Sequence, residues 1–286
     1  MSKLYLCSFA SPDLKISVKK YLKEARSLNF YEKIKVFGIN DLSKERVNQI
    51  KEFFKKGERR LYGFACWKPE IIMSFLNEIP EGAIVQYSDI GCSFNQNGIN
   101  RLQEYVRIAE KNSILAFKYF RPNFNIIEDI KYQIYYEFEY TKKSVLDYFD
   151  VTKNQNILNT EQIWSGTIFF KNNIISKEII KKWKDACSIS KLINDDISDE
   201  INHKYFKEHR HDQSIFSIIC KLRKIECLSA SEIEWAEYKN KRVWFHLKEF
   251  PVLATRYKRF NFFRRFIERQ KKKFKQAYLQ KINKYI

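Results

Sequence analysis

The chain has 286 residues, of which 44% are hydrophobic and 16% aromatic, enough to bury one large core or two smaller ones. This composition excludes a wholly disordered chain, and the 7 Gly and 5 Pro exclude collagen-like and Pro/Gly-rich classes. The formal net charge of +19 predicts an anionic partner, which is a nucleic acid, a membrane surface or a phosphorylated ligand.

Short apolar runs alternate with stretches of helical spacing along most of the chain. In order, the predicted elements are strand 3–10, helix 12–27, strand 33–39, helix 42–54 capped by Asp41, a helix from Pro69 to before Pro80, strand 83–89, helix 99–112, strand 113–120, a short helix 141–151, strand 162–172, helix 176–188 and helix 212–225. The alternation predicts a mostly parallel sheet with crossover helices. We therefore expect one α/β domain over residues 1–255, followed by a basic tail over residues 256–286.

Trp67 and Lys68 stand directly before Pro69, at the start of a predicted helix. The first turn of a helix offers free N–H groups to an anion, and Lys68, Arg59 and Arg60 could contact phosphates there. The alternative is a tryptophan packed in the core with its neighbouring cations in solvent.

Asp89 ends the buried strand "AIVQYSD". Open α/β sheets bind ligands at the carboxyl ends of their strands, where a carboxylate can ligate a divalent cation or accept a hydrogen bond from a sugar hydroxyl. Gly91 would let a ligand approach the backbone closely. The alternative is that Asp89 caps a turn.

Gly166 lies inside the predicted strand 162–172. A glycine within a strand marks a close approach by a ligand or by backbone, and Gln162 and Ser165 beside it could hydrogen-bond a sugar. The alternative is a small residue tolerated beneath a helix.

The segment "HRHDQ" at 209–213 gathers ionisable side chains and an amide just ahead of a predicted helix. Asp212 fits the N-cap of that helix, but capping does not explain the whole cluster. His209 and His211 are two positions apart, so in an extended loop they would face opposite sides and would not bind one metal. Their spacing from Cys220 is also wrong for zinc.

The sequence contains no motif typical of several other classes of enzyme. The sequence contains no G-x-S-x-G, G-x-x-x-x-G-K-[ST] or G-x-G-x-x-G motif, which disfavours serine hydrolases, P-loop NTPases and typical dinucleotide enzymes. The six cysteines include no C-x-x-C pair and predict reduced, buried thiols of a cytosolic protein. We expect neither a signal peptide nor a membrane span.

The tail carries most of the excess charge. Residues 256–286 hold 12 Lys and Arg and one acid, Glu268, which leaves +8 for the rest of the chain. Apolar residues recur near i, i+4 steps among these cations, at Phe263, Ile267, Phe274, Tyr278 and Ile282. Such a basic amphipathic helix can lie on an anionic membrane surface. The alternatives are a solvated helix packed on the domain or a nucleic-acid-binding tail, for which no recognised motif is present.

Four segments together resemble a bacterial glycosyltransferase family encoded in lipopolysaccharide and capsule clusters. They are "RRLYGFACWKPEII", "GAIVQYSDIGC", "EQIWSGTIFFKN…KKWKDAC" and "NHKYFKEHRHDQSIFSIICKL", and the late "VLATRYK" resembles the closing segment of that family. The likeness covers residues 4–258. It implies a GT-A-like fold, which is a single Rossmann-related α/β domain with a mixed, mostly parallel sheet.

More broadly, the pattern is similar to nucleotide-sugar-dependent transferases of the GT-A fold. This wider likeness implies a D-x-D motif that holds Mn²⁺ or Mg²⁺ on the donor diphosphate, with Asp89 at the first acidic position. The second acid is missing because position 91 is Gly, so metal dependence is left open. His246 is a candidate metal ligand by analogy with GT-A enzymes that use a late histidine. The alternative is an ordinary histidine in a strand.

The implied site residues fall in the four segments and in the closing one. Catalytic roles are assigned to Asp212, Asp89 and His211, with Asp212 as the acid that contacts the acceptor or the reaction centre. Donor binding is assigned to Trp67, Lys68, Asp89, Gly91, Ser165, Gly166, Arg210, Gln213 and Arg256. The leaving diphosphate needs positive charge, from a metal at Asp89 or from Lys68, Arg210 or Arg256. An inverting reaction also needs a carboxylate base.

We therefore expect a glycosyltransferase that moves a sugar from a nucleotide-sugar donor to a growing surface glycan or glycolipid. Its expected place is the cytoplasm, at the inner face of the cytoplasmic membrane, with the tail on anionic lipid and no nucleic acid as partner. The alternatives are a non-catalytic nucleotide- or carbohydrate-binding protein of the same fold, or a nucleic-acid-binding protein that uses its basic tail.

Overall fold

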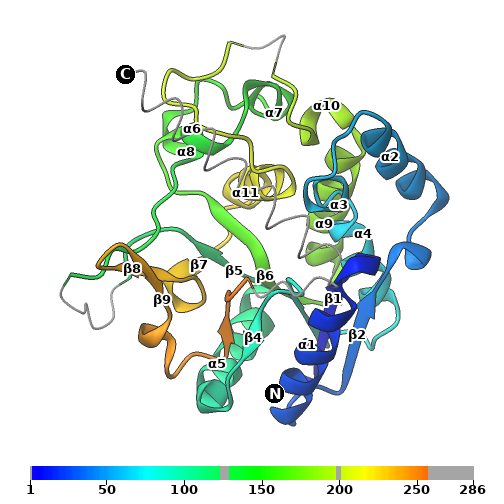
Figure 1. Ribbon diagram of the computed structural model, residues 1–286, viewed down its shortest axis with the longest axis vertical. Helices are drawn as coiled ribbons and strands as arrows, with labels where there is room; N and C mark the ends of the chain where they lie inside the picture. Colours follow the sequence, from blue (N-terminus) through cyan, green and yellow to red (C-terminus); the bar gives the residue numbers. More distant parts are fainter. Residues whose placement is uncertain (1, 123–128, 198–200, 257–286) are drawn as a thin grey trace, which may run out of the picture.

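A six-stranded sheet forms the centre of the protein in the computed structural model, which describes residues 2–122, 129–197 and 201–256. Its order is β2-β1-β3-β6-β5-β7 (Figure 1). The strands are β1 (Leu4–Phe9), β2 (Lys33–Phe37), β3 (Ile84–Ser88), β5 (Ile114–Lys118), β6 (Ile163–Lys171) and β7 (Cys227–Ser229). β6 runs antiparallel to β3 and β5, and the other pairs are parallel. The predicted α/β fold with a mixed, mostly parallel sheet is confirmed.

Helices cover both faces of this sheet, so the domain has three layers. Strand side chains alternate between two cores: Leu4 and Leu6 face one, whereas Cys7 and Phe9 face the other. The first core is closed by α1 (Lys15–Ser27) and α5 (Ile99–Asn112), and the second by α2 (Lys44–Lys55), α4 (Lys68–Asn77), α9 (Ile174–Ser188) and α11 (Asp212–Leu222). Each of these helices overlaps a predicted one.

The short elements, including β7 of the central sheet, were not predicted, apart from a helix near 141–151 that the structure places at α7 (Lys143–Tyr148). The others are α3 (Leu61–Phe64), α6 (Glu137–Tyr140), α8 (Gln155–Leu158), α10 (Ser190–Ile193), β4 (Ser93–Phe94), β8 (Ala236–Tyr238), β9 (Lys241–Val243) and β10 (Val252–Leu253), with 3-10 turns at Pro12–Leu14, Ile39–Asp41, Gln96–Gly98, Ala230–Glu232 and Phe245–Leu247. Figure 1 shows α6, α7 and α8 at the top of the view and the β8–β9 hairpin at its left edge.

Two predicted helix caps are wrong. Ser43 rather than Asp41 caps α2, because the Ser43 hydroxyl accepts the Arg46 N–H at 3.3 Å while Asp41 ends the preceding 3-10 turn. At α11 the N-cap is His211, and Asp212 is the first helical residue. Its carboxylate is therefore available for contacts outside the helix.

Five of the six cysteines are buried and Cys227 is half-buried, with no disulfide among them. No helix in the part of the chain that the structure describes is long and apolar enough to cross a membrane. Beyond Arg256, the basic tail predicted at 256–286 lies outside the described residues.

Candidate functional site

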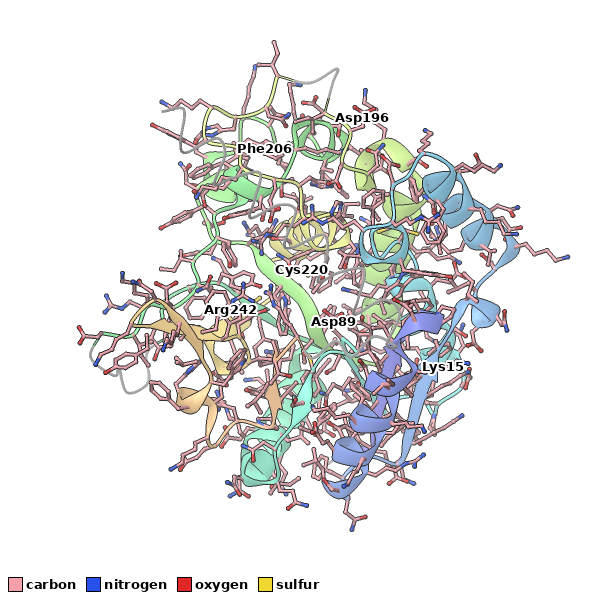
Figure 2. All side chains as sticks on the ribbon, viewed as in Figure 1. Lys15, Asp89, Asp196, Phe206, Cys220 and Arg242 are labelled. Atoms are coloured by element: carbon pink, nitrogen blue, oxygen red, sulfur yellow. The ribbon has the colours of Figure 1, made fainter. Side chains whose placement is uncertain are left out.

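A pocket of about 540 Å³ opens at one edge of the central sheet. Phe9 at the end of β1 and Asp89 just after β3 line it, as do Ser165 and Gly166 near the start of the antiparallel β6. Figure 2 shows Asp89 near the centre of the molecule in this view. The pocket thus lies at the carboxyl ends of parallel strands, where open α/β sheets bind their ligands.

The structure brings eleven of the predicted site residues together around this pocket. They are Trp67, Lys68, Asp89, Gly91, Ser165, Gly166, Arg210, His211, Asp212, Gln213 and Arg256. They come from four distant stretches of chain and from the last described residue, so only the fold unites them.

A buried ion pair lies at the centre of the pocket wall. The Lys68 ammonium is 2.7 Å from the Asp212 Oδ2, and both side chains are 4% exposed. The Ser165 hydroxyl donates to the same carboxylate oxygen at 2.8 Å. Lys68 also donates to the Ser165 Oγ at 3.1 Å and to its carbonyl at 3.2 Å. These contacts fix the position of the Asp212 carboxylate.

Asp89 lies beside this pair and faces solvent. Its side chain is 49% exposed, and its Oδ1 is 3.6 Å from the Lys68 ammonium. The Tyr87 hydroxyl donates to that same oxygen at 2.6 Å, and the Asp89 N–H donates to the Gly166 carbonyl at 2.8 Å. Asp89 is therefore the accessible carboxylate of the pocket, held in place from two sides.

Burial and charge act in opposite directions on the central pair. Burial raises the pKa of Asp212, although Lys68 and the Ser165 hydroxyl oppose the shift. Burial disfavours the charged form of Lys68, but Asp212 and Asp89 outweigh it and hold the Lys68 pKa above its usual value. The ammonium thus stays charged, and Asp212 is a stronger base than a solvent-exposed aspartate.

Five cationic side chains and five carboxylates line the pocket, so the lining is close to neutral. Most of the arginines are already paired. Arg256 contacts both oxygens of Glu234, at 3.1 and 3.3 Å, and Arg60 contacts Asp195 and Glu208 at 3.4 and 3.3 Å. An anionic ligand that binds to these paired arginines would therefore have to displace the carboxylates that they now contact.

Two aromatic rings hold Arg210 at the pocket wall. Its guanidinium lies 4.0 Å from the Tyr135 ring centre and 4.2 Å from that of Tyr140. Its buried Nε has no partner among the described residues. One of its terminal nitrogens lies 3.4 Å from a Glu208 carboxylate oxygen, so an anionic ligand would compete with Glu208 for a guanidinium that is already fixed in place.

His209 and His211 do not face opposite sides, so that prediction is wrong. Their rings are 5.3 Å apart and both bond to one segment, His209 Nε2 to the Leu192 carbonyl at 2.9 Å and His211 Nδ1 to the Ile193 carbonyl at 2.8 Å. The cause is the unusual backbone of His211, with φ of 52°. Burial, reinforced by nearby cations, lowers the pKa of His211 to about 3, so its ring is neutral and supplies no positive charge at neutral pH.

Trp67 was considered either as a core residue or as part of a ligand site, and its position is compatible with both. Its ring stacks on Phe9 with centroids 3.9 Å apart, and it also lines the pocket. The prediction of free N–H groups at this helix start is wrong. The N–H groups of Lys68 and Glu70 donate to backbone carbonyls of the same turn, and Pro69 has none.

Packing against a neighbouring side chain explains the glycine at position 166, which also lines the pocket. A Cβ at this position would lie 2.2 Å from the Trp164 ring. Gln162 was predicted to bind a sugar, but it is fully buried away from the pocket lining. Its carbonyl oxygen accepts from the Gln213 amide at 2.6 Å, which positions that pocket residue.

The donor set does not fit the two-carboxylate metal site that is typical of GT-A-fold transferases. Within residues 2–122, 129–197 and 201–256, no three His, Cys, Asp or Glu side chains gather as metal ligands. His246 is not part of the pocket lining, and its Nε2 donates to the Glu234 carbonyl at 3.1 Å. The Lys68 ammonium also occupies the approach to one oxygen of Asp89.

Sequence reasoning missed Glu234, which lines the pocket and is 2% exposed. Burial raises its pKa, and Arg256 partly reverses the shift. The segment "SEIEW" has no helical or strand periodicity, because it lies in an irregular turn after β7. An acid between Ile233 and Trp235 is the one signal that could have indicated it.

No protein-family model matches the sequence, and no curated protein matches it either. Similar solved structures include the apo form of mouse xyloside xylosyltransferase 1, with 9% identity over 81% of this chain and 87% of that one at a TM-score of 0.40. Another is a glycosyltransferase involved in glycosylating the major capsid of the virus PBCV-1, with 11% identity over 88% and 91% at 0.45. A third is 4-diphosphocytidyl-2C-methyl-D-erythritol synthase from Anaerococcus prevotii, with 12% identity over 85% and 90% at 0.34. TM-scores this low leave the function to be inferred from the site itself.

Proposed function

We propose that the protein is a glycosyltransferase that moves a sugar from a nucleotide-sugar donor to an acceptor glycan in this pocket. The observation that carries the proposal is the buried Asp212, held by Lys68 and Ser165 next to the half-exposed Asp89. A fixed carboxylate beside an accessible one, at the ligand-binding edge of an α/β sheet, suits a reaction in which one substrate loses a proton and another loses an anion.

Arginines around the pocket would receive the donor diphosphate. Arg210 offers a guanidinium fixed against two rings. Arg210, Arg60 and Arg256 would exchange carboxylate partners for phosphate oxygens. Guanidinium groups match phosphate oxygens through paired hydrogen bonds. As the bond between the sugar and the diphosphate breaks, these cations would stabilise the charge on the departing nucleoside diphosphate.

Asp212 would act as the base in an inverting reaction. The acceptor hydroxyl attacks the anomeric carbon, its proton passes to the Asp212 carboxylate, and the bond to the diphosphate oxygen breaks on the opposite side. The raised pKa of Asp212 favours this proton transfer. His211 is neutral and bonded to the Ile193 carbonyl, so its proposed role is to hold the start of α11 in place.

For the acceptor we propose a growing surface glycan, as in lipopolysaccharide, lipooligosaccharide or capsule, with the reaction at the inner face of the cytoplasmic membrane. The support is the resemblance of the four segments and the basic composition of residues 256–286. Deleting residues 257–286 should release the protein from anionic liposomes, and undiminished binding would refute the membrane proposal.

A panel of nucleotide sugars tests the reaction. The donor should raise the melting temperature of the purified protein and should be consumed when an acceptor is present. Asp212→Asn should keep donor binding but slow consumption by about 10²- to 10⁴-fold. If no nucleotide sugar binds and cellular glycans are unchanged in both Asp89→Ala and Asp212→Ala strains, the proposal fails.

The second candidate is a non-catalytic nucleotide- or carbohydrate-binding protein of the same fold. Gly91 favours it, because that residue takes the place of the second acid in the D-x-D motif of GT-A-fold transferases in general. Measurable donor turnover would eliminate it.

A further inference from the structure

One ammonium group lies where the two carboxylates of the pocket converge. Lys68 Nζ is 2.7 Å from Asp212 Oδ2 and 3.6 Å from Asp89 Oδ1, and two oxygens of Ser165 lie within 3.2 Å of it. The ring of Tyr87 packs below it, with the centroid 5.1 Å from Nζ. All the polar atoms around this positive charge are oxygens.

Carboxylate, hydroxyl and carbonyl oxygens are also the ligands that Mg²⁺ and Mn²⁺ take from proteins. Here those oxygens surround a lysine instead. The side chain belongs to the first residue of α4 and is 4% exposed, so it is anchored at its base and enclosed along its length. It therefore cannot move into solvent without uncovering two carboxylates.

We propose that Lys68 takes the place of a divalent cation in this pocket, so that ligands bind without added metal and removal of the ammonium creates a Mn²⁺ site between Asp89 and Asp212. A dication beside Asp89 would face the Lys68 charge at close range inside the protein, where repulsion is much stronger than in water. This inference deepens the proposed function, but its central test needs no turnover.

Mn²⁺ alone is the first probe, titrated into the wild-type protein and followed by electron paramagnetic resonance of the free ion. We expect no saturable binding. With UDP, GDP or CDP present, the affinity of whichever nucleotide binds should be the same, within about twofold, in Mn²⁺ and in EDTA. Saturable Mn²⁺ binding to the wild type that Asp89→Asn abolishes would overturn the inference.

Lys68→Met is the second probe. It should bind Mn²⁺ roughly tenfold or more tightly than the wild type, because two carboxylates lose the cation that neutralised them. The added change Asp89→Asn should remove the gained binding. Lys118→Met is the matched control, since Lys118 pairs with a single carboxylate, Glu161 at 3.1 Å, outside the pocket lining.

A folded Lys68→Met protein with wild-type Mn²⁺ affinity would contradict the proposal. If that variant does not fold, the wild-type titration still decides the question. Failure of the proposed function gives a different result, because then no nucleotide binds with or without Mn²⁺ while the Mn²⁺ titrations are unaffected.

Discussion

Two buried ion pairs of similar composition lie toward the two ends of α11. In each, a lysine ammonium contacts a carboxylate that also accepts a serine hydroxyl; the groups are Lys68, Asp212 and Ser165 at one end, and Lys221, Glu137 and Ser217 at the other. The nitrogen–oxygen distances of the two pairs are 2.7 and 2.6 Å. The residue types and these distances therefore do not distinguish the two ion pairs.

The two ion pairs differ in their surroundings. Glu137 is fully buried and accepts further hydrogen bonds from Thr141 and Gln162, and Lys221 donates to two backbone carbonyls. Burial lowers the pKa of Lys221, although Glu137 opposes the shift, whereas two carboxylates hold the pKa of Lys68 above its usual value. One pair is enclosed on all sides as a support. The other lies beside a pocket and a half-exposed second carboxylate, where we propose that the reaction takes place.

The largest expected difference between the two pairs is in activity. Asp212→Asn should slow glycosyl transfer by about 10²- to 10⁴-fold, the usual contribution of a general base, because an amide cannot take the proton of the acceptor. Rates of donor consumption at saturating acceptor would measure it.

Glu137→Gln is the matched control and should lower the melting temperature while leaving the transfer rate within a few-fold of wild type. Equal rate losses in the two variants would show that the pocket pair is no more than a support.

Replacement of Lys221, the lysine of the second pair, should lower the stability of the protein rather than its activity. Lys221→Met leaves Glu137 buried without its cation, and breaking a buried pair costs about 3–5 kcal/mol. Urea unfolding would measure this loss, and nucleotide affinity should not change. A stable Lys221→Met variant with weakened nucleotide binding would contradict the division between support and site.

Acid should destabilise the pocket end of α11. The pKa of His211 is lowered to about 3 and that of His209 is also lowered, in both cases because of burial and nearby positive charge. Between pH 6.5 and 5 the unfolded chain binds protons on these rings that the folded chain does not. The free energy of unfolding should therefore fall by up to about 2 kcal/mol per histidine over that range.

His211→Gln should flatten the pH dependence of unfolding relative to the wild type, whereas the same change at the exposed His203 should leave it intact. Identical slopes in all three proteins would mean that His211 does not carry the effect. The difference between proteins isolates the histidine from carboxylates such as Asp212, whose raised pKa acts in the opposite direction.

Much of the layered core could be predicted because it depends on local patterns. Strand β3 is an apolar run, and α5 has clear helical spacing, so each appears in the sequence near its observed bounds. The hairpin of β8 and β9 and the pairing of β4 with β10 could not be predicted, because strands of two or three residues leave no periodicity to detect.

The candidate site was predictable as a set of residues but not as an arrangement. Asp89 and Asp212 were identified from their segments, yet nothing local shows that Lys68 joins them, since it is 144 residues from Asp212. Gln162 was misplaced because its position in a strand does not reveal whether its side chain faces the pocket or a closed network. Glu234 was missed because irregular turns carry no pattern.

A further effect on stability concerns the shape of the pocket wall beside Ser165. Gly166→Ala should destabilise the protein by about 1–3 kcal/mol, because the added Cβ would lie 2.2 Å from the Trp164 ring and one of the two must move. Trp164 also lines the pocket, so nucleotide affinity should fall together with the melting temperature. Gly38→Ala is the control, since its Cβ would meet its nearest atom at 3.9 Å. If both variants melt alike and bind alike, Gly166 is merely tolerated, and the wall next to Ser165 has more room than its packing indicates.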